Sequence, residues 1–146
     1  MTRATRAGST ADDFNSRVVA EFRANAGRVG GPLAGTPMVL VHHIGAKSGI
    51  ERVTPLACSA QGDRRYAIVA SNGGSRTHPG WYYNLKANPT VKVEFGAETF
   101  MVLAEELKGP ARDALWPELV AASPSLHGFQ ATAARHIPLF MLTRVD

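Results

Sequence analysis

Three short runs of strand-forming residues, divided by only a few residues each, constrain the fold of this chain more than any other feature. The runs are MVLVHHI, RVTPLACSA and RRYAIVAS, with GAKSG and the turn-forming QGD between them. A doubly wound parallel sheet needs a helix after nearly every strand, and these connections are too short to contain one. The three runs therefore predict an antiparallel meander.

The second half of the chain adds strands and helices to this sheet. Two strands are predicted between residues 91 and 107, joined by a Gly-Ala turn, and a last one in PLFMLTR. Helices are predicted at residues 79–87 and 110–122. Asn88, followed by a proline, supplies a left-handed stop to the first of them. About six antiparallel strands with flanking helices predict a mainly β, α+β chain that closes into a barrel and leaves few exposed sheet edges.

An amphipathic helix is predicted ahead of the strands. Three apolar residues recur at every fourth position: Phe14, Val18 and Phe22. Thr10 or Asp12 is expected to cap this helix and Gly27 to end it. Two interpretations stay open, because the helix could dock on the barrel or contact a membrane surface or partner. The second would use the nearby arginines, which are Arg3, Arg6, Arg17, Arg23 and Arg28.

The length of 146 residues fits one domain with one core. We expect a flexible tail at residues 1–11, the helix and a linker at 12–36, and the barrel at 37–146. No apolar run approaches the roughly 20 residues that span a bilayer, and the first ten residues lack the apolar region of a secretory signal. A cytoplasmic protein is expected, with the N-terminal helix as the candidate for peripheral contact with the inner face of the membrane.

Residue types exclude several kinds of site. Cys58 is the only cysteine, which excludes an intramolecular disulfide and a thiolate cluster. No pair of the five histidines has metal-ligand spacing, so no metal site is predicted. The net charge of +4 favours anionic partners. The positive residues are scattered and accompany no recognition motif, so nucleic-acid binding is not expected.

The turn between the first two strands is a candidate anion site. Lys47 and Arg52 can neutralise a negative charge, Ser48 can donate to an oxygen, and the backbone N–H groups of a glycine-containing turn can line an anion nest. The spacing differs from a P-loop, and a strand rather than a helix follows. An ordinary basic hairpin turn is the alternative.

A second polar segment lies between the third strand and the helix at residues 79–87. Ser71 and Asn72 end an apolar strand, where their donors could address the edge of a ring, and the glycines behind them permit close approach of a planar ligand. The N-terminus of the helix adds a partial positive charge. A surface loop without function is the alternative.

Three sequence blocks resemble one family. GAKSGIERVTPL, VASNGG and HPGWYYNLKANPTVKV are similar to the deazaflavin (coenzyme F420)-dependent nitroreductases and quinone reductases of actinobacteria. The resemblance implies a split β-barrel like that of flavin mononucleotide (FMN)-binding oxidases, and hydride transfer from reduced coenzyme F420 to an organic acceptor. It implies that the cofactor is bound by Ala46, Lys47, Ser48, Gly49, Arg52, Val53, Thr54, Pro55, Leu56, Ala57, Ala70, Ser71, Asn72, Gly80, Trp81 and Asn84.

The acceptor side departs from the best-studied members, which are tyrosine-rich there. The matching positions place Ala57, Leu126 and Phe129 in the substrate pocket, so hydroxyl donors for a nitro or quinone oxygen are lost. These losses disfavour the reduction of nitroimidazoles, and the expected acceptor is a quinone-like, enone or nitro compound. The cofactor itself carries the hydride chemistry, so the protein needs to supply only a proton to the acceptor. This proton is expected from Ser71, the candidate catalytic donor, from His127 or from solvent.

Two other functions remain open, and so does the assembly. An FMN-dependent oxidoreductase on the same barrel is the runner-up, because a basic loop suits either phosphate. A non-catalytic carrier or sensor of coenzyme F420 would also explain the missing tyrosines. A homodimer is expected because related barrels often pair.

Overall fold

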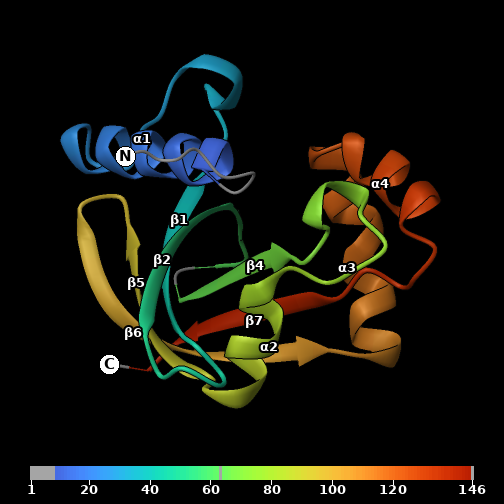
Figure 1. Cartoon of the computed structure of the whole chain (residues 1–146). Helices are drawn as coiled ribbons and strands as arrows, with labels where there is room; N and C mark the ends of the chain where they lie inside the picture. Colours follow the sequence, from blue (N-terminus) through green and yellow to red (C-terminus); the bar gives the residue numbers. More distant parts are fainter. Residues whose placement is uncertain (1–8, 63, 146) are drawn as a thin grey trace.

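The computed structural model describes residues 9–62 and 64–145, which form a curled antiparallel sheet with helices around it (Figure 1). The seven strands are β1 Met38–Ile44, β2 Glu51–Ala57, β3 Ser59–Ala60, β4 Arg65–Val69, β5 Thr90–Phe95, β6 Glu98–Leu107 and β7 Leu139–Arg144. The helices are α1 Ser9–Ala24, α2 Gly80–Ala87, α3 Gly109–Ala122 and α4 Ser125–Ala133, with 3₁₀ turns η1 Gly31–Leu33 and η2 Asn72–Gly74. The expected split-barrel-like α+β fold is confirmed.

The strand order is β2-β1-β5-β6-β7-β4-β3, and every neighbouring pair is antiparallel. Consecutive runs pair as the expected meander requires: β1 pairs with β2, and β3, which is the end of the second run, pairs with β4. The second run is divided between the two edges of the sheet, however, and the other neighbour of β4 is β7. The second run breaks at Cys58, whose N–H donates to the Pro37 carbonyl at 3.0 Å. This break ends β2 and sends the chain into the short strand β3.

The core lies inside the curled sheet. Val39, Val41, Ile68 and Phe140 are among its buried side chains. Helix α2 contacts β1 and β6, and it buries Trp81 and Leu85, which stand at i, i+4 on one helix face. Because α2 is anchored in this way, the residues on its other faces are held at a fixed position beside the β1–β2 turn.

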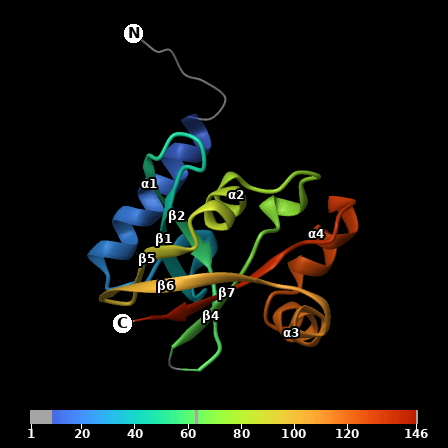
Figure 2. The same cartoon turned by 90° about the horizontal axis from the view of Figure 1, so that it is seen from below.

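Helix α1 docks on the outer face of the sheet at the β1–β2 end, and α3 and α4 lie at the opposite end (Figures 1 and 2). Val18 and Phe22 pack against Met38 and Leu40. Arg23 reaches β5, where its Nη2 lies 2.6 Å from an Oε2 atom of Glu94. Docking on the barrel accounts for Val18 and Phe22 of the apolar stripe, whereas Phe14 is 40% exposed.

The helix ends differ from the expectation. Helix α1 already begins at Ser9, so Thr10 and Asp12 lie within it instead of capping it. Gly27 does follow its end, with φ +94° and its N–H donating to the Phe22 carbonyl at 2.8 Å. Residues 1–8 of the expected tail lie outside the described residues. No helix of the described chain is long and apolar enough to cross a membrane.

Two further local expectations are corrected. Asn88 has φ −133° and ψ 82°, not the left-handed conformation, because the following proline restricts the residue before it to extended backbone. Helix α4 was not expected, because Pro124 and Gly128 hide its helical pattern. It packs through Leu126 onto Leu139 and Met141 of β7.

Candidate functional site

A groove lies between the β1–β2 turn and helix α2. Its volume is about 670 Å³, and its lining comes from the turn, from the start of β2 and from one face of α2. The lining residues are Gly45, Ala46, Lys47, Ser48, Arg52, Gly80, Tyr83 and Asn84. The structure thus brings the candidate anion loop together with Gly80 and Asn84, two positions far from it in the sequence.

A chain of hydrogen bonds fixes the turn to α2. The Ala46 N–H donates to Oδ1 of Asn84 at 2.9 Å, so the Asn84 amide group turns its Nδ2 toward His43. Nδ2 lies 2.9 Å from Nδ1 of His43, and Nε2 of His43 lies 2.8 Å from Oγ1 of Thr54. Because Nδ2 can only donate, Nδ1 of His43 accepts, and the imidazole proton resides on Nε2. We call this chain of four residues the Asn84 relay.

Electrostatics agree with a neutral imidazole in the relay. Burial, followed by the positive charges of Arg52 and His42, lowers the pKa of His43 to about 4. A proton on Nδ1 would face the donating amide of Asn84. The relay is therefore stable only with His43 neutral, and the positive charge at this end of the groove comes from Lys47 and Arg52.

Lys47 and Arg52 are the two cations of the groove that can bind an anion. Lys47 and Arg52 are exposed, and neither makes an ion pair with any residue in the described part of the chain. The turn that carries Lys47 is tightly folded, with the Gly45 N–H donating to the Ile50 carbonyl at 2.9 Å and Gly49 at φ +71°. The Ser48 hydroxyl also holds the turn, because its Oγ accepts from the Ile50 N–H at 3.1 Å, and it keeps its own proton to donate to a ligand.

The other predicted positions on β2 extend away from this groove. Val53 is half-buried and packs on the side of α1, and Leu56 packs against the core. Pro55 is half-buried and Ala57 is exposed at the end of the strand. Strand β2 also contacts β4.

The second polar segment begins where β4 ends. Ala70 is buried, Ser71 is half-buried, and Asn72 is exposed with φ +49°. None of these three residues lines the groove at the β1–β2 turn. The candidate site therefore has two ends, one at the turn with Lys47 and one at the end of β4, with the length of β2 between them.

The remaining candidates are packed side chains, except for His127. Trp81 is only 7% exposed and meets Phe140 edge to face at 5.9 Å between ring centroids, so most of its ring is used by the core. Leu126 is buried on α4, and Phe129 is half-buried on the same helix beside η2. His127 is exposed.

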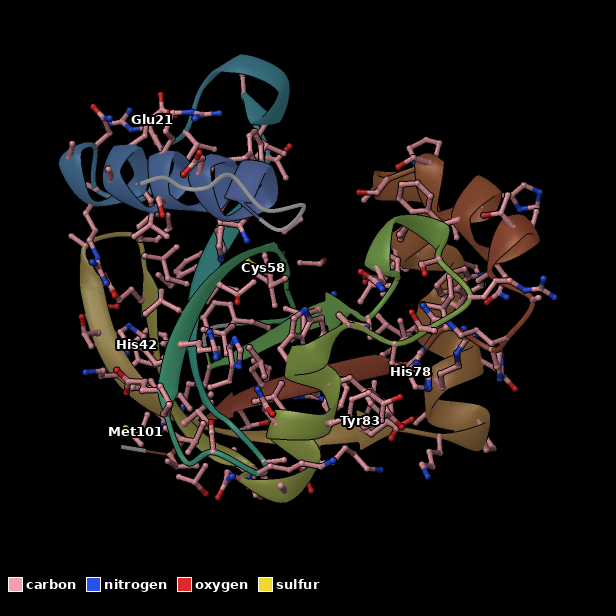
Figure 3. All side chains as sticks on the ribbon, viewed as in Figure 1. Glu21, His42, Cys58, His78, Tyr83 and Met101 are labelled. Carbon is pink, nitrogen blue, oxygen red and sulfur yellow. The ribbon has the colours of Figure 1, made fainter. Side chains whose placement is uncertain are left out.

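The sequence reasoning missed Tyr83 and His43. Tyr83 is exposed on α2 and lines the groove (Figure 3). Gly80, Tyr83 and Asn84 stand at i, i+3 and i+4, and this spacing could have placed Tyr83 on the same face. His42 and His43 alternate across β1 and point to opposite faces of the sheet, and both are buried, because α1 covers the outer face of β1. His42 lies there between Glu94 and Glu51, at 2.7 and 3.4 Å.

Comparison with known proteins agrees with this architecture. The family model described as F420H(2)-dependent quinone reductase matches residues 15–144. The chain belongs to this family. The family description names the cofactor and the reaction, so the expected resemblance, the oxidoreductase class and coenzyme F420 in place of FMN are confirmed. The match also includes most of α1, which the resemblance by motifs did not.

Members of the F420H2-dependent quinone reductase family align over most of the chain. An F420H(2)-dependent quinone reductase of Mycobacterium tuberculosis (strain ATCC 25618 / H37Rv) is 38% identical over 127 residues, which are 84% of this chain and 85% of that protein. A solved F420-H2 dependent reductase, FDR-A, is 42% identical with a TM-score of 0.66, covering 73% of this chain and 93% of its own. A chain described as a domain-swapped dimer is 35% identical with a TM-score of 0.68, and the match covers 93% of this chain and 99% of that chain.

Proposed function

We propose that this chain is an F420H2-dependent reductase of a quinone-like acceptor, with the anionic end of the cofactor bound at the β1–β2 turn. The observation that carries the proposal is a pair of cations, Lys47 and Arg52, that have no ion-pair partner within residues 9–62 and 64–145 and lie in a groove fixed by the Asn84 relay. A cofactor with a phosphate and carboxylates fits a groove that offers two free positive charges and a hydroxyl.

Each group at the turn has a distinct task. Lys47 and Arg52 neutralise the phosphate and carboxylates, and Ser48 donates to one of their oxygens. Asn84 holds the turn against α2, so these groups need no rearrangement when the ligand arrives. Gly80 and Tyr83 form the facing wall.

The other end of the site holds the ring system and the acceptor. When bound, coenzyme F420 supplies the hydride. Pro55, Leu56 and Ala57 of β2 flank the ring on one side, and Ala70, Ser71 and Asn72 on the other. Ala57, Leu126 and Phe129 give an apolar surface that excludes water from the acceptor. The hydroxyl of Ser71 is the candidate proton or hydrogen-bond donor to the acceptor oxygen.

Fluorescence titration with oxidised coenzyme F420 tests the cofactor site. We expect micromolar or tighter binding for the wild-type protein and weaker binding, by about tenfold each, for Lys47→Ala and Arg52→Ala. Lys92→Ala removes an exposed lysine on β5 and is the matched control. Unchanged affinity in both groove variants would refute the assignment. Preference for FMN in a parallel titration would favour the flavin alternative.

Anaerobic oxidation of F420H2 with a soluble naphthoquinone tests the reaction. Loss of the F420H2 signal with formation of the hydroquinone is expected. Nitro compounds and enones are tested alongside to define the range of acceptors. Tight cofactor binding without oxidation by any of these acceptors would favour the carrier or sensor.

We also propose that the chain forms a homodimer and that α1 can contact a membrane surface. A 35% identical relative is described as a domain-swapped dimer, which supports the first proposal. Phe14 is 40% exposed beside the arginines of α1, and this supports the second. Light scattering of the purified protein tests dimerisation, with a monomer as the contradicting result. Sedimentation with anionic vesicles tests membrane contact, using Phe14→Ser as the variant that should lose it.

A further inference from the structure

The segment after β4 adopts a backbone that needs support from outside. Asn72, Gly73 and Gly74 have consecutive positive φ values of 49°, 63° and 82°. The left-handed conformation is unfavourable for a residue other than glycine, such as Asn72. The Asn72 side chain donates to the Thr77 carbonyl at 3.1 Å, which closes the segment on itself. This local bond does not fix the segment relative to the sheet.

Arg135 supplies that fixation from a distant part of the chain. Its Nη2 donates to the Ala70 carbonyl at 3.2 Å and to the Ser71 carbonyl at 2.9 Å, and its Nε donates to the Ser75 carbonyl at 3.0 Å. One planar guanidinium thus joins three carbonyls of the segment.

The same guanidinium also fixes a histidine. Nη1 of Arg135 lies 2.9 Å from Nδ1 of His78, and because a guanidinium can only donate, Nδ1 accepts and the proton resides on Nε2. Burial and the charge of Arg135 lower the pKa of His78. The His78 ring stacks on Tyr82 at 4.1 Å, ahead of α2 (Figure 3). Arg135 therefore connects the end of β4 to the start of α2.

Helix α4 completes the support. Oγ1 of Thr132 donates to the Gly74 carbonyl at 3.0 Å, and a Cβ added at Gly74 would come within 3.0 Å of Cα of Phe129. Arg135 follows the left-handed Ala134 at the end of α4. The end of α4 and the segment after β4 are thus packed into one unit.

We propose that Arg135 is a positioning residue for coenzyme F420: it holds Ala70 and Ser71 in the orientation in which they flank the deazaflavin ring. This inference rests on the proposed function, since that function places the ring beside these residues. Arg135 acts through their backbone and does not contact the cofactor. Its loss should weaken contacts with the ring and leave contacts with the anionic end unchanged.

Two ligands separate this role from general destabilisation. Coenzyme F420 carries the ring, phosphate and tail, whereas the deazaflavin riboside carries the ring alone. Arg135→Met should weaken binding of both by the same factor, about tenfold, whereas Lys47→Ala should weaken only coenzyme F420. Arg135→Lys, which retains the charge but has a single donating nitrogen, should recover part of the affinity.

Arg112→Met is the matched control. Arg112 is also buried by the α3 and α4 corner and donates to a backbone carbonyl, that of Ile137 at 2.8 Å, but it does not bond the segment after β4. Its loss should lower the melting temperature without changing either affinity. Equal affinities in Arg135→Met and the wild type would overturn the inference alone, whereas a wild type that binds neither ligand would overturn the proposed function.

A second measurement does not depend on the ligands. Nitrogen-15 NMR of the imidazoles should show His78 with its proton on Nε2 in the wild type and a mixture of tautomers in Arg135→Gln, whose amide can either donate or accept. The same tautomer in both proteins, with unchanged affinity for the riboside, would overturn the positioning role even where Arg135→Met fails to fold.

Discussion

Substitution of Asn84 tests the relay that holds the anion groove. Asn84→Ala removes the acceptor of the Ala46 N–H and the donor to Nδ1 of His43. Each hydrogen bond contributes about 1 kcal/mol, and the buried imidazole nitrogen left without its donor adds a further cost, so the free energy of unfolding should fall by about 2 to 3 kcal/mol. For a chain of this size the melting temperature should fall by roughly 8 °C.

Asn84→Asp separates the relay from simple loss of packing. The new carboxylate can still accept from Ala46, but it cannot donate to Nδ1 of His43. The imidazole proton should therefore move to Nδ1, and the pKa of His43 should rise from about 4, because a carboxylate now faces the ring.

Calorimetry and nitrogen-15 NMR of the histidines measure both effects. Asn25→Ala is the control, since Asn25 is an exposed asparagine whose side chain bonds only within the end of α1. Should Asn84→Ala melt like the wild type, or should His43 keep its tautomer in Asn84→Asp, the relay would not be what holds the turn.

Three further results are expected. The pKa of His43 is lowered to about 4 and that of Glu94 to about 2, so both groups take up protons at a higher pH in the unfolded state than in the folded state. The free energy of unfolding should therefore fall as the pH is lowered from about 6.5 to 4 through His43, and from about 4.5 to 2 through Glu94. Urea denaturation across this range measures the effect, and a constant free energy of unfolding would contradict both assignments. Burial raises the pKa of Cys58 to about 12, so a thiol reagent should label the native protein far more slowly than the unfolded one; equal labelling rates would show that the thiol is accessible. Gly27→Ala should destabilise the protein by more than 1 kcal/mol, because Gly27 has φ +94° and the added Cβ would lie 2.7 Å from Cα of Gly96. Thermal denaturation measures this loss. A melting temperature equal to that of the wild type would mean that the α1 linker can move away from the β5–β6 turn.

Local sequence patterns predicted most of the elements because they depend on neighbouring residues. The strand at MVLVHHI and the long strand after the Gly-Ala turn occupy the predicted residues, and α2 begins one position from its predicted start. The pairing of β4 with β7 was not predicted, since it joins residues far apart in the chain and no local pattern specifies such a register.

The candidate site divides in the same way. The cations at the turn were predicted from a compact motif, and the structure joins them with Asn84 in one groove. His43 and Arg135 were not predicted, because each acts through hydrogen bonds to residues distant in sequence. The residues next to a histidine in a strand, or next to an arginine after a helix, do not indicate which distant residues these side chains will bond.

The place of β7 in the sheet bears on how the protein is made. β7 is the last of the seven strands along the chain, yet it lies between β6 and β4 and joins the two parts of the sheet. Until the ribosome has released residues 139–144, β4 and β6 each present an unpaired edge. A domain whose sheet is completed only by its last strand presents unpaired strand edges during synthesis, and such edges favour aggregation. The tendency of the nascent chain to aggregate should therefore fall once β7 has paired, and the complete site at the end of β4 should form only after that step.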